Sequence, residues 1–242
     1  MLREQHELDL VVVNGENAEN GSGITKAIFN RLRDHGVDGV TLGDHIDRKR
    51  EIIPILESDA PVIRPANYPP EAPGREWMTL ITTSGVPFCV VSLIGRVFMK
   101  PADCPFHAAD RIWSQLPEKR GGVLVDFHAE ATSDKQLLGR YLDGRASAVL
   151  GTHTHVTTAD EQILPSGTAF QCDVGMTGPH DGIIGRRYDR VMETTFTQRP
   201  TSFNVAKGDN RLSGTLVVVD SRTQKAVSIE RVKVNEDASQ GS

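Results

Sequence analysis

Four short apolar runs, each followed directly by residue types that bind metal ions, constrain the fold of this chain most strongly. They are residues 9–13 before Asn14-Gly15-Glu16-Asn17, 39–42 before Gly43-Asp44-His45, 122–127 before His128, and 146–150 before Gly151-Thr152-His153-Thr154-His155. Short runs rich in Val and Leu are typical of buried strands in α/β proteins. Open α/β sheets build their sites at the carboxyl ends of strands. We therefore expect a packed sheet system to bring these polar ends together.

The last run ends in two histidines, His153 and His155. On extended backbone, side chains two residues apart point to the same side with Cα atoms roughly 6–7 Å apart, so the pair can serve one metal or two adjacent metals. An isolated pair of this kind is more often two solvated loop histidines. The three other strand ends favour the metal interpretation.

The remaining segments complete an α/β pattern. Helical spacing predicts helices at 25–35, 48–57, 108–116 and 133–142. A hairpin at 78–83 and 87–94 indicates a mixed sheet. The C-terminal part is expected to be antiparallel, with strands at 192–197, 202–206, 211–220 and 226–234, and 235–242 are expected to form a disordered tail. In the proline-rich loop 60–75, local hydrogen bonds are expected for Arg64 and Asn67 rather than substrate contacts.

Size and composition restrict the class of protein. A chain of 242 residues and 26.5 kDa is most economically a single domain, residues 1–242. The net charge is -5 and the basic residues are scattered, which argues against an extended nucleic-acid-binding face. We expect no membrane span and no signal peptide, and therefore a cytoplasmic location with reduced cysteines.

The residue types at the strand ends indicate a particular chemistry. Carboxylate, amide and imidazole ligands together suit Fe, Mn or Zn, and there are too many of them for one tetrahedral zinc. Two metals about 3.5–4 Å apart, bridged by a carboxylate, can clamp the oxygens of a phosphoryl group and lower the pKa of a bridging water. The reaction expected from such a site is hydrolysis of a phosphate ester.

Seven blocks of sequence carry a family resemblance. They are Asn14-Gly15-Glu16-Asn17, Gly43-Asp44-His45, Arg64-Pro65-Ala66-Asn67, and residues 126–132, 143–149, 151–156 and 173–179. From about residue 9 to 235 they resemble the YmdB-type branch of the calcineurin-like metallophosphoesterases. The resemblance implies a four-layer α/β fold, in which two mixed β-sheets pack face to face and are flanked by helices. It also implies a binuclear metal centre and hydrolysis of small-molecule phosphodiesters, including cyclic nucleotides.

The same resemblance implies roles for seven residues. The metal ligands would be Glu16, Asn17, Asp44, His128, His153 and His155. Glu16 would bridge two divalent or trivalent ions, Fe or Mn more than Zn. Asn17 and His155 would hold one ion, and the other three ligands would hold the second. His45 would be catalytic and would stabilise or protonate the leaving oxygen, a role that suits an imidazole.

The chain departs from the family pattern in two places. The family begins with a strand that ends in a Gly-Asp motif whose aspartate binds a metal, whereas this sequence starts inside the helix that follows. Either the start codon lies upstream, or the protein lacks a sheet edge and one ligand of the metal held by Asn17 and His155. The second departure is Asp44, where the family has Asn. Its extra negative charge is expected to tighten cation binding and to repel an anionic phosphate.

These departures keep alternatives open. One is a catalytically impaired relative that acts as a regulatory or binding protein. A weaker one is an amidohydrolase that uses the His-x-His pair, although that class places the motif on an early strand of an eight-stranded barrel. A missing sheet edge would leave backbone groups unpaired, which predicts self-association into a homo-oligomer.

Overall fold

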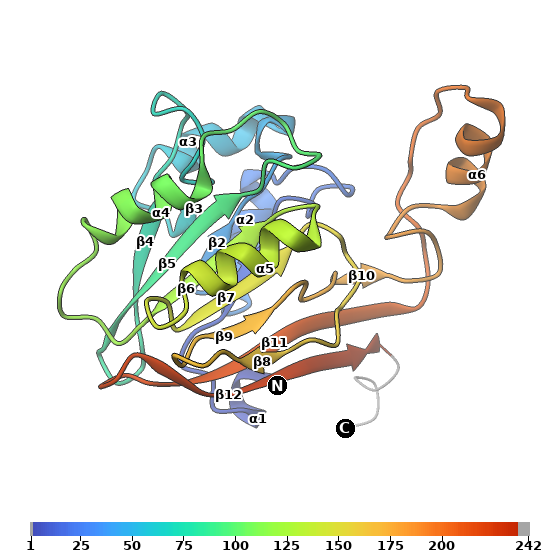
Figure 1. The fold of residues 1–242 in the computed structure, drawn as a ribbon. Helices are drawn as coiled ribbons and strands as arrows, with labels where there is room; N and C mark the ends of the chain where they lie inside the picture. The colour runs from blue at the N-terminus through green and yellow to red at the C-terminus, as the bar shows by residue number, and fades with distance from the viewer. Residues whose placement is uncertain (1, 237–242) are drawn as a thin grey trace.

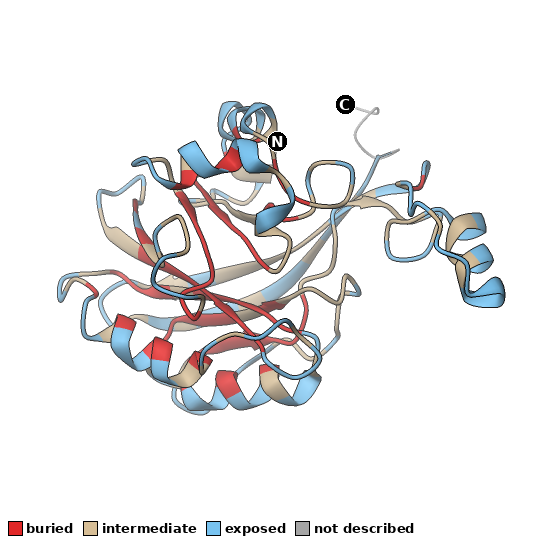
Figure 2. Cartoon of the chain, turned by 90° about the horizontal axis from the view of Figure 1, so that it is seen from above, coloured by how far each residue is buried: buried red, intermediate tan, exposed pale blue. Residues whose placement is uncertain are grey.

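Two β-sheets packed face to face form the centre of this computed structural model, which describes residues 2–236 (Figure 1). Helices cover the outer face of each sheet, so the order of layers is helix, sheet, sheet, helix. The buried residues lie along the strands and on the inner faces of the helices (Figure 2). The predicted four-layer α/β fold is confirmed.

The first sheet is parallel and carries two of the predicted strand ends. It consists of β1 (Val12–Asn14), β2 (Gly39–Thr41) and β3 (Val62–Ile63). Helices α2 (Lys26–Asp34) and α3 (Ile53–Leu56) cover its outer face. Phe29 of α2 and Leu56 of α3 pack with Val40 of the sheet, and this burial of apolar surface holds the layer in place.

The second sheet is mixed and has the order β4-β5-β6-β7-β9-β8. Its strands are β4 (Trp77–Ile81), β5 (Pro87–Ile94), β6 (Val123–His128), β7 (Ala148–Thr152), β8 (Gln162–Ile163) and β9 (Ala169–Gln171). The middle strands β5, β6, β7 and β9 are parallel, and the edge strands β4 and β8 are antiparallel to their neighbours. Helices α4 (Pro105–Trp113) and α5 (Thr132–Tyr141) cover its outer face.

The two sheets meet through a small apolar cluster. Ile63 of β3 packs with Met78 and Leu80 of β4 and with Val90 of β5. All four side chains are at most 7% exposed. This contact sets the sheets against each other, so the carboxyl ends of their parallel strands meet on one side of the molecule.

The C-terminal part adds a third sheet and a projecting arm. The sheet contains β10 (Gly178–Pro179), β11 (Asn210–Asp220) and β12 (Lys225–Asn235), all antiparallel. Between β10 and β11 the chain leaves the body and forms α6 (Tyr188–Thr197), none of whose residues is buried. The remaining short elements are α1 (Leu2–Gln5) and the 3-10 turns η1 (Ile46–Arg48) and η2 (Arg50–Ile52).

Three predicted elements are wrong. The segment 192–197 is the end of helix α6 rather than a strand, because no neighbouring strand is there to satisfy its backbone groups and helical hydrogen bonds do so instead. Residues 202–206 form only one isolated bridge, between Val205 and Arg186. The helix expected at 48–57 is broken into η1, η2 and α3, with Pro54, which lacks a backbone N–H, in the first turn of α3.

The predicted tail, 235–242, is described only in part. Asn235 is the last residue of β12 and Glu236 follows it, and 237–242 lie outside the described residues. Among residues 2–236 there is no helix with the length and apolar character that a membrane crossing requires.

Candidate metal centre

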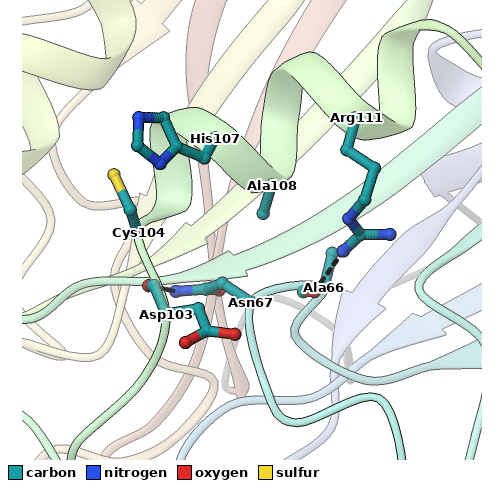
Figure 3. A pocket seen from close by; sticks show the side chains of 7 residues that line it. All are labelled: Ala66, Asn67, Asp103, Cys104, His107, Ala108 and Arg111. Carbon is teal, nitrogen blue, oxygen red and sulfur yellow. Dashed lines mark hydrogen bonds between the residues drawn. The ribbon is translucent and has the colours of Figure 1, made fainter.

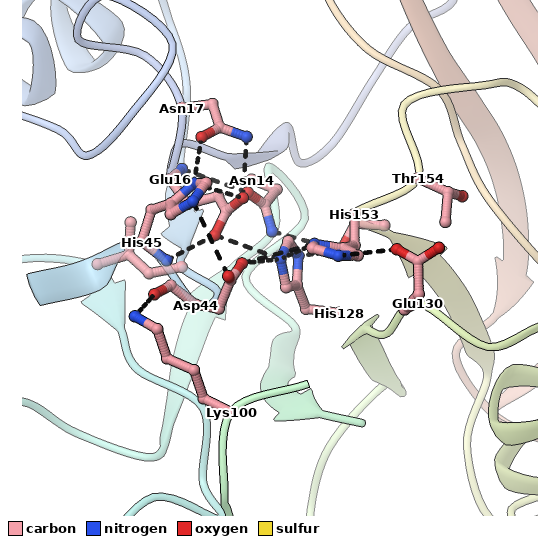
Figure 4. A network of polar contacts seen from close by, with 12 residues as sticks. Asn14, Glu16, Asn17, Asp44, His45, Lys100, His128, Glu130, His153 and Thr154 are labelled. Atoms are coloured by element: carbon pink, nitrogen blue, oxygen red, sulfur yellow. Dashed lines mark hydrogen bonds and ion pairs between the residues drawn. The ribbon is translucent and has the colours of Figure 1, made fainter. Parts of the chain in front are cut away.

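Four of the predicted ligands converge at the ends of four strands. We call Glu16, Asp44, His128 and His153 the inner cluster; one potential ligand atom from each lies within 4.8 Å of the others. His128 Nε2 is 3.0 Å from Asp44 Oδ1 and 3.3 Å from Glu16 Oε2, and His153 Nδ1 is 3.5 Å from Asp44 Oδ1. Figure 4 shows the side chains directed toward one another from different strand ends.

Strand register and a glycine explain why these side chains meet. In the β6-β7 pair His128 lies opposite Thr152, so His153 is the next residue beyond the strand. Gly43 precedes Asp44, and a Cβ atom at Gly43 would lie 2.5 Å from Glu16 Oε2 and 2.5 Å from His128 Nε2. Only glycine leaves room for both ligands at this point, because real Cβ atoms do not approach other atoms so closely.

The other three predicted residues form a second group, the outer trio of Asn17, His45 and His155. Asn17 Nδ2 donates to Glu16 Oε1 at 2.9 Å and lies 3.2 Å from His155 Nε2. His45 Nδ1 is 2.7 Å from Asn17 Oδ1. Glu16 therefore presents Oε1 to the outer trio and Oε2 to the inner cluster, as a bridging ligand requires.

The His-x-His segment differs from the extended geometry predicted from sequence. Strand β7 ends at Thr152, and both histidines have positive φ, 95° at His153 and 67° at His155. The Asp173 carboxylate accepts hydrogen bonds from the backbone N–H and the hydroxyl of Thr154, which fixes the bend between them. Such backbone strain is often stored at functional sites. As a result His153 faces the inner cluster and His155 faces Asn17.

The electrostatics of the inner cluster favour a bound cation. Glu16 is 2% exposed and His128 is 1% exposed. Burial by itself disfavours the charged forms, but attraction between His128 and the two carboxylates outweighs it. The pKa of Glu16 and that of Asp44 are lowered, and the pKa of His128 is raised to about 10. The two carboxylates thus favour a positive charge between them.

The donor set fits a metal ion at that position. Among the described residues, neither Glu16 nor Asp44 has a Lys or Arg side chain as an ion-pair partner; the ion-pair partners of both are histidines. The Nε2 proton of His128 lies among Glu16, Asp44 and His153, which is where a cation shared by the four residues would lie. In the outer trio, a half-turn of the Asn17 amide exchanges its oxygen and nitrogen and turns Oδ1 toward Glu16 and His155.

Buried Asp126 supports the inner cluster, a role that the sequence analysis did not assign. Its carboxylate accepts hydrogen bonds from Asn14 Nδ2 at 2.9 Å, from Thr152 Oγ1 at 2.7 Å and from the Thr41 hydroxyl. Since Thr152 donates to Asp126, its oxygen accepts the Nδ1 proton of His128, which lies 2.9 Å away. The chain from Asp126 through Thr152 thus orients His128 with Nε2 toward the ligands. The sequence could have indicated this role, because side chains alternate along a strand and Asp126 therefore points to the same face of β6 as His128.

Three further residues position the loop that carries His153. Glu130 Oε2 lies 3.1 Å from His153 Nε2, which leaves Nδ1 directed at the inner cluster. Lys135 Nζ donates to Asp173 Oδ2 at 2.9 Å, and both side chains are buried. An acidic residue two positions after His128 was visible in the sequence. The pairing of Lys135 with Asp173 was not, because it joins residues 38 positions apart in the chain.

The proline-rich loop plays a structural part, but the predicted local hydrogen bonds form only at Arg64, because Asn67 bonds residues 27 and 36 positions away. Asn67 donates to the carbonyl groups of Ile94 and Asp103, and Arg64 donates to those of Pro65 and Ala72. A cavity of about 290 Å³ lies beside this loop, between Asn67 and the residues 103–111 of helix α4 and its N-terminal end (Figure 3). None of the predicted site residues lines it. Arg111, on its wall, pairs with Glu76 and donates to the carbonyl of Ala66.

A second cavity, of about 320 Å³, is lined by His155 of the outer trio. It lies against the third sheet, with Arg211 and Ser213 of β11 and Lys233 of β12 on its wall. Of these two cavities, it is the one that adjoins the converged residues.

Comparison with known proteins places this geometry in a family. The family described as YmdB-like protein matches residues 1–232. A 2',3'-cyclic-nucleotide 2'-phosphodiesterase of Bacillus subtilis is 44% identical over 236 residues, which cover 98% of this chain and 89% of that protein. The fold is shared with a hypothetical protein of Thermus thermophilus, with a TM-score of 0.90, 45% identity, and coverage of 96% of this chain and 90% of that one.

A more distant solved structure agrees. It is described as a novel phosphatase of Mycoplasma pneumoniae, is 27% identical, has a TM-score of 0.89, and the match covers 97% of this chain and 85% of that chain. The resemblance predicted from the sequence motifs is confirmed. With a family match over nearly the whole chain and a relative of 44% identity, this chain belongs to the YmdB-like protein family.

Proposed function

We propose that this chain hydrolyses phosphodiesters, cyclic nucleotides among them, with the help of two metal ions held by the inner cluster and the outer trio. The observation that carries the proposal is the convergence of Glu16, Asp44, His128 and His153 within 4.8 Å, with no Lys or Arg ion-pair partner for either acid among residues 2–236. The enzyme class agrees with the names of the Bacillus subtilis phosphodiesterase and the Mycoplasma pneumoniae phosphatase.

The ligand roles follow from which atoms face one another. Glu16 serves both ions, because its two oxygens face the two groups. Asp44, His128 and His153 hold the inner ion, and Asn17 and His155 hold the outer one. Their carboxylate, amide and imidazole atoms suit Fe or Mn, with Zn as a third choice. Two such ions, when bound, supply Lewis-acid activation of the phosphoryl group and of water.

The protein's own groups account for orientation and proton transfer. Glu130 and the Asp126-Thr152 pair fix the rings of His153 and His128, so the ligand atoms are in place before substrate arrives. His45 lies at the rim, where its side chain is 26% exposed and its Nε2 is 3.9 Å from Asp44 Oδ2. An imidazole in that position can give a proton to the leaving oxygen of the ester.

The alternative of a catalytically impaired regulatory or binding protein rests on Asp44. A carboxylate here adds negative charge next to the substrate phosphate, which favours a protein that binds metal but turns over slowly. Lys100 does not neutralise this charge, because its Nζ donates to the backbone carbonyl of Asp44 at 3.0 Å and pairs with Asp47 Oδ2 at 3.5 Å. We favour the enzyme over a regulatory binding protein because the relatives are described as a phosphodiesterase and a phosphatase.

The test combines metal content with turnover. Metal per chain is measured together with hydrolysis of an aryl phosphodiester and of 2',3'-cyclic nucleotides, for the unaltered protein and for His128→Ala. We expect about two ions per chain and turnover that His128→Ala lowers by at least about a hundredfold, since only Glu16, Asp44 and His153 would remain to hold the inner ion. His35→Ala, at an exposed histidine after α2, is the matched control and should retain both.

The outcomes separate the two proposals. Two ions without turnover, unchanged when Asp44 is replaced by Asn, would support the regulatory protein. Absence of bound metal after supplementation with Fe, Mn or Zn would contradict both. Self-association and a cytoplasmic location also stay predictions; light scattering of the purified chain tests the first.

A further inference from the structure

The cavity that adjoins the outer trio combines an apolar wall with a positively charged end. His155 lines it and at the same time faces Asn17 through Nε2, so the cavity begins where the proposed metal centre ends. Met176 and Ile184 supply apolar surface on its wall. Its volume of about 320 Å³ is within the range of ligand-binding pockets.

The positive end is built by the β11-β12 hairpin. Lys233 lies directly opposite Ser213 in the register, and Arg211 is two residues before Ser213, on the same face of the sheet. The two cations are therefore diagonal neighbours, with Cα atoms about 7–8 Å apart by standard sheet geometry. Both side chains line the cavity, so this end of its wall carries positive charge to which an anion can bind.

The other groups around the pair leave donors for such an anion. Arg211 uses Nε and Nη2 on Asp209, and Nη1 has no hydrogen-bond partner among the described residues. The Lys233 side chain has neither an ion pair nor a hydrogen bond within the described part of the chain, although its charge helps to lower the pKa of Asp209. His180 lies 2.9 Å from the Gly178 carbonyl through Nδ1, which leaves Nε2 available. Among residues 2–236, Asp209 is thus the acid linked to both cations, by a hydrogen bond from Arg211 and by the charge of Lys233.

We infer that this cavity binds the nucleoside end of the substrate and that Lys233 and Arg211 bind a second phosphate group carried there. This inference rests on the proposed function, and it deepens it by naming the substrate class: phosphodiesters that carry another phosphate on the 5' side of the same nucleoside. The apolar wall suits a base, because nucleobases bind to apolar and aromatic side chains through their faces. The cationic end suits a phosphate.

Two kinds of substrate would carry this 5'-phosphate group. In one, it is the terminal phosphate of a mononucleotide. In the other, it is the linkage to the preceding nucleotide of an oligonucleotide.

Binding can be measured without turnover. Adenosine 3'-monophosphate and adenosine 3',5'-bisphosphate are titrated into the metal-loaded protein by calorimetry. We expect the bisphosphate to bind about tenfold more tightly, the effect of one charge-assisted hydrogen bond. Lys233→Met and Arg211→Met should each lower the ratio of the two affinities toward one. Lys233→Arg keeps the positive charge and should keep the ratio near ten. Lys225→Met removes a charge from the other end of the same strand and should leave the ratio unchanged.

The results discriminate between the inference and the function beneath it. Equal affinities for the two ligands in the unaltered protein, or a preference that survives loss of both cations, would overturn the inference whether or not the protein is active. A preserved preference without hydrolysis of any phosphodiester would support the inference as a binding site and reject the proposed function. Tighter binding of a dinucleotide with a 3'-phosphate than of the bisphosphate would identify an oligonucleotide end, and the reverse would identify a mononucleotide.

Discussion

The inner cluster and the outer trio differ in how the chain holds them. The inner residues lie at or just beyond the ends of β1, β2, β6 and β7, and a buried carboxylate, Asp126, joins these strands through Asn14, Thr41 and Thr152. The outer residues extend from loops: Asn17 and His45 bond each other, and His155 bonds the carbonyl of exposed Ile184. The site is therefore built on strand ends on one side and on loops on the other, and Glu16 presents one carboxylate oxygen to each side.

Loss of the Asp126 carboxylate should produce the largest effect. Asp126→Leu leaves the polar groups of Asn14, Thr41 and Thr152 without their acceptor in a buried place. We expect the free energy of unfolding to fall by about 3–5 kcal/mol and inner metal to be lost. Urea denaturation with metal analysis checks this. The control is Asp181→Leu, in the segment between β10 and β11, which should have little effect because the Asp181 carboxylate is in no ion pair with a described residue. Equal losses of stability and metal in both variants would contradict the special role of Asp126.

Removal of His45 should separate chemistry from metal binding. His45→Ala takes away the proposed proton donor while leaving every proposed ligand in place. Turnover should fall about 10²–10⁴-fold with both ions still bound. Steady-state kinetics and metal analysis on the same sample test this, and a leaving group of low pKa should recover part of the rate. Loss of an ion would show that His45 is a ligand instead.

Removal of His155 should sharpen the contrast between the two groups. His155→Ala is expected to lower the metal content from about two ions to about one, because the inner cluster does not contact this ring. Metal binding to the folded state also raises stability, by about 2.7 kcal/mol per ion at a hundredfold excess over its Kd. Thermal melts with and without metal should show a smaller gain than in the unaltered chain. If both ions are lost, the two groups do not bind independently.

The smallest effect is expected on the projecting arm. Phe196 of α6 is 78% exposed and packs against no core, so Phe196→Ser should change the free energy of unfolding by less than about 0.5 kcal/mol. Chemical denaturation measures this. Light scattering of the same variant tests self-association: conversion from an oligomer to a monomer would assign this exposed helix to an interface. A large loss of stability in a chain that is monomeric throughout would mean that the arm packs on the body.

The sequence by itself determined the strand ends and the types of ligand they carry. Val- and Leu-rich runs before Glu16, Asp44 and His128 are local signals, since burial and alternation are set by neighbouring residues. All seven predicted site residues lie together in the structure, because the packed sheets bring these strand ends to one side of the molecule. Sequence blocks also identified the family and its four layers.

Tertiary structure decided what depends on distant partners. The bend at His153 and His155 is held by Asp173, and the ring of His128 is oriented through Asp126, contacts that join residues far apart in the chain or in different strands. The helix at 188–197 replaced a predicted strand because no partner strand reached it. Likewise, the pairing of Lys233 with Ser213 follows from the hairpin register. Local sequence cannot report these features, because each depends on which segments the packed sheets bring side by side.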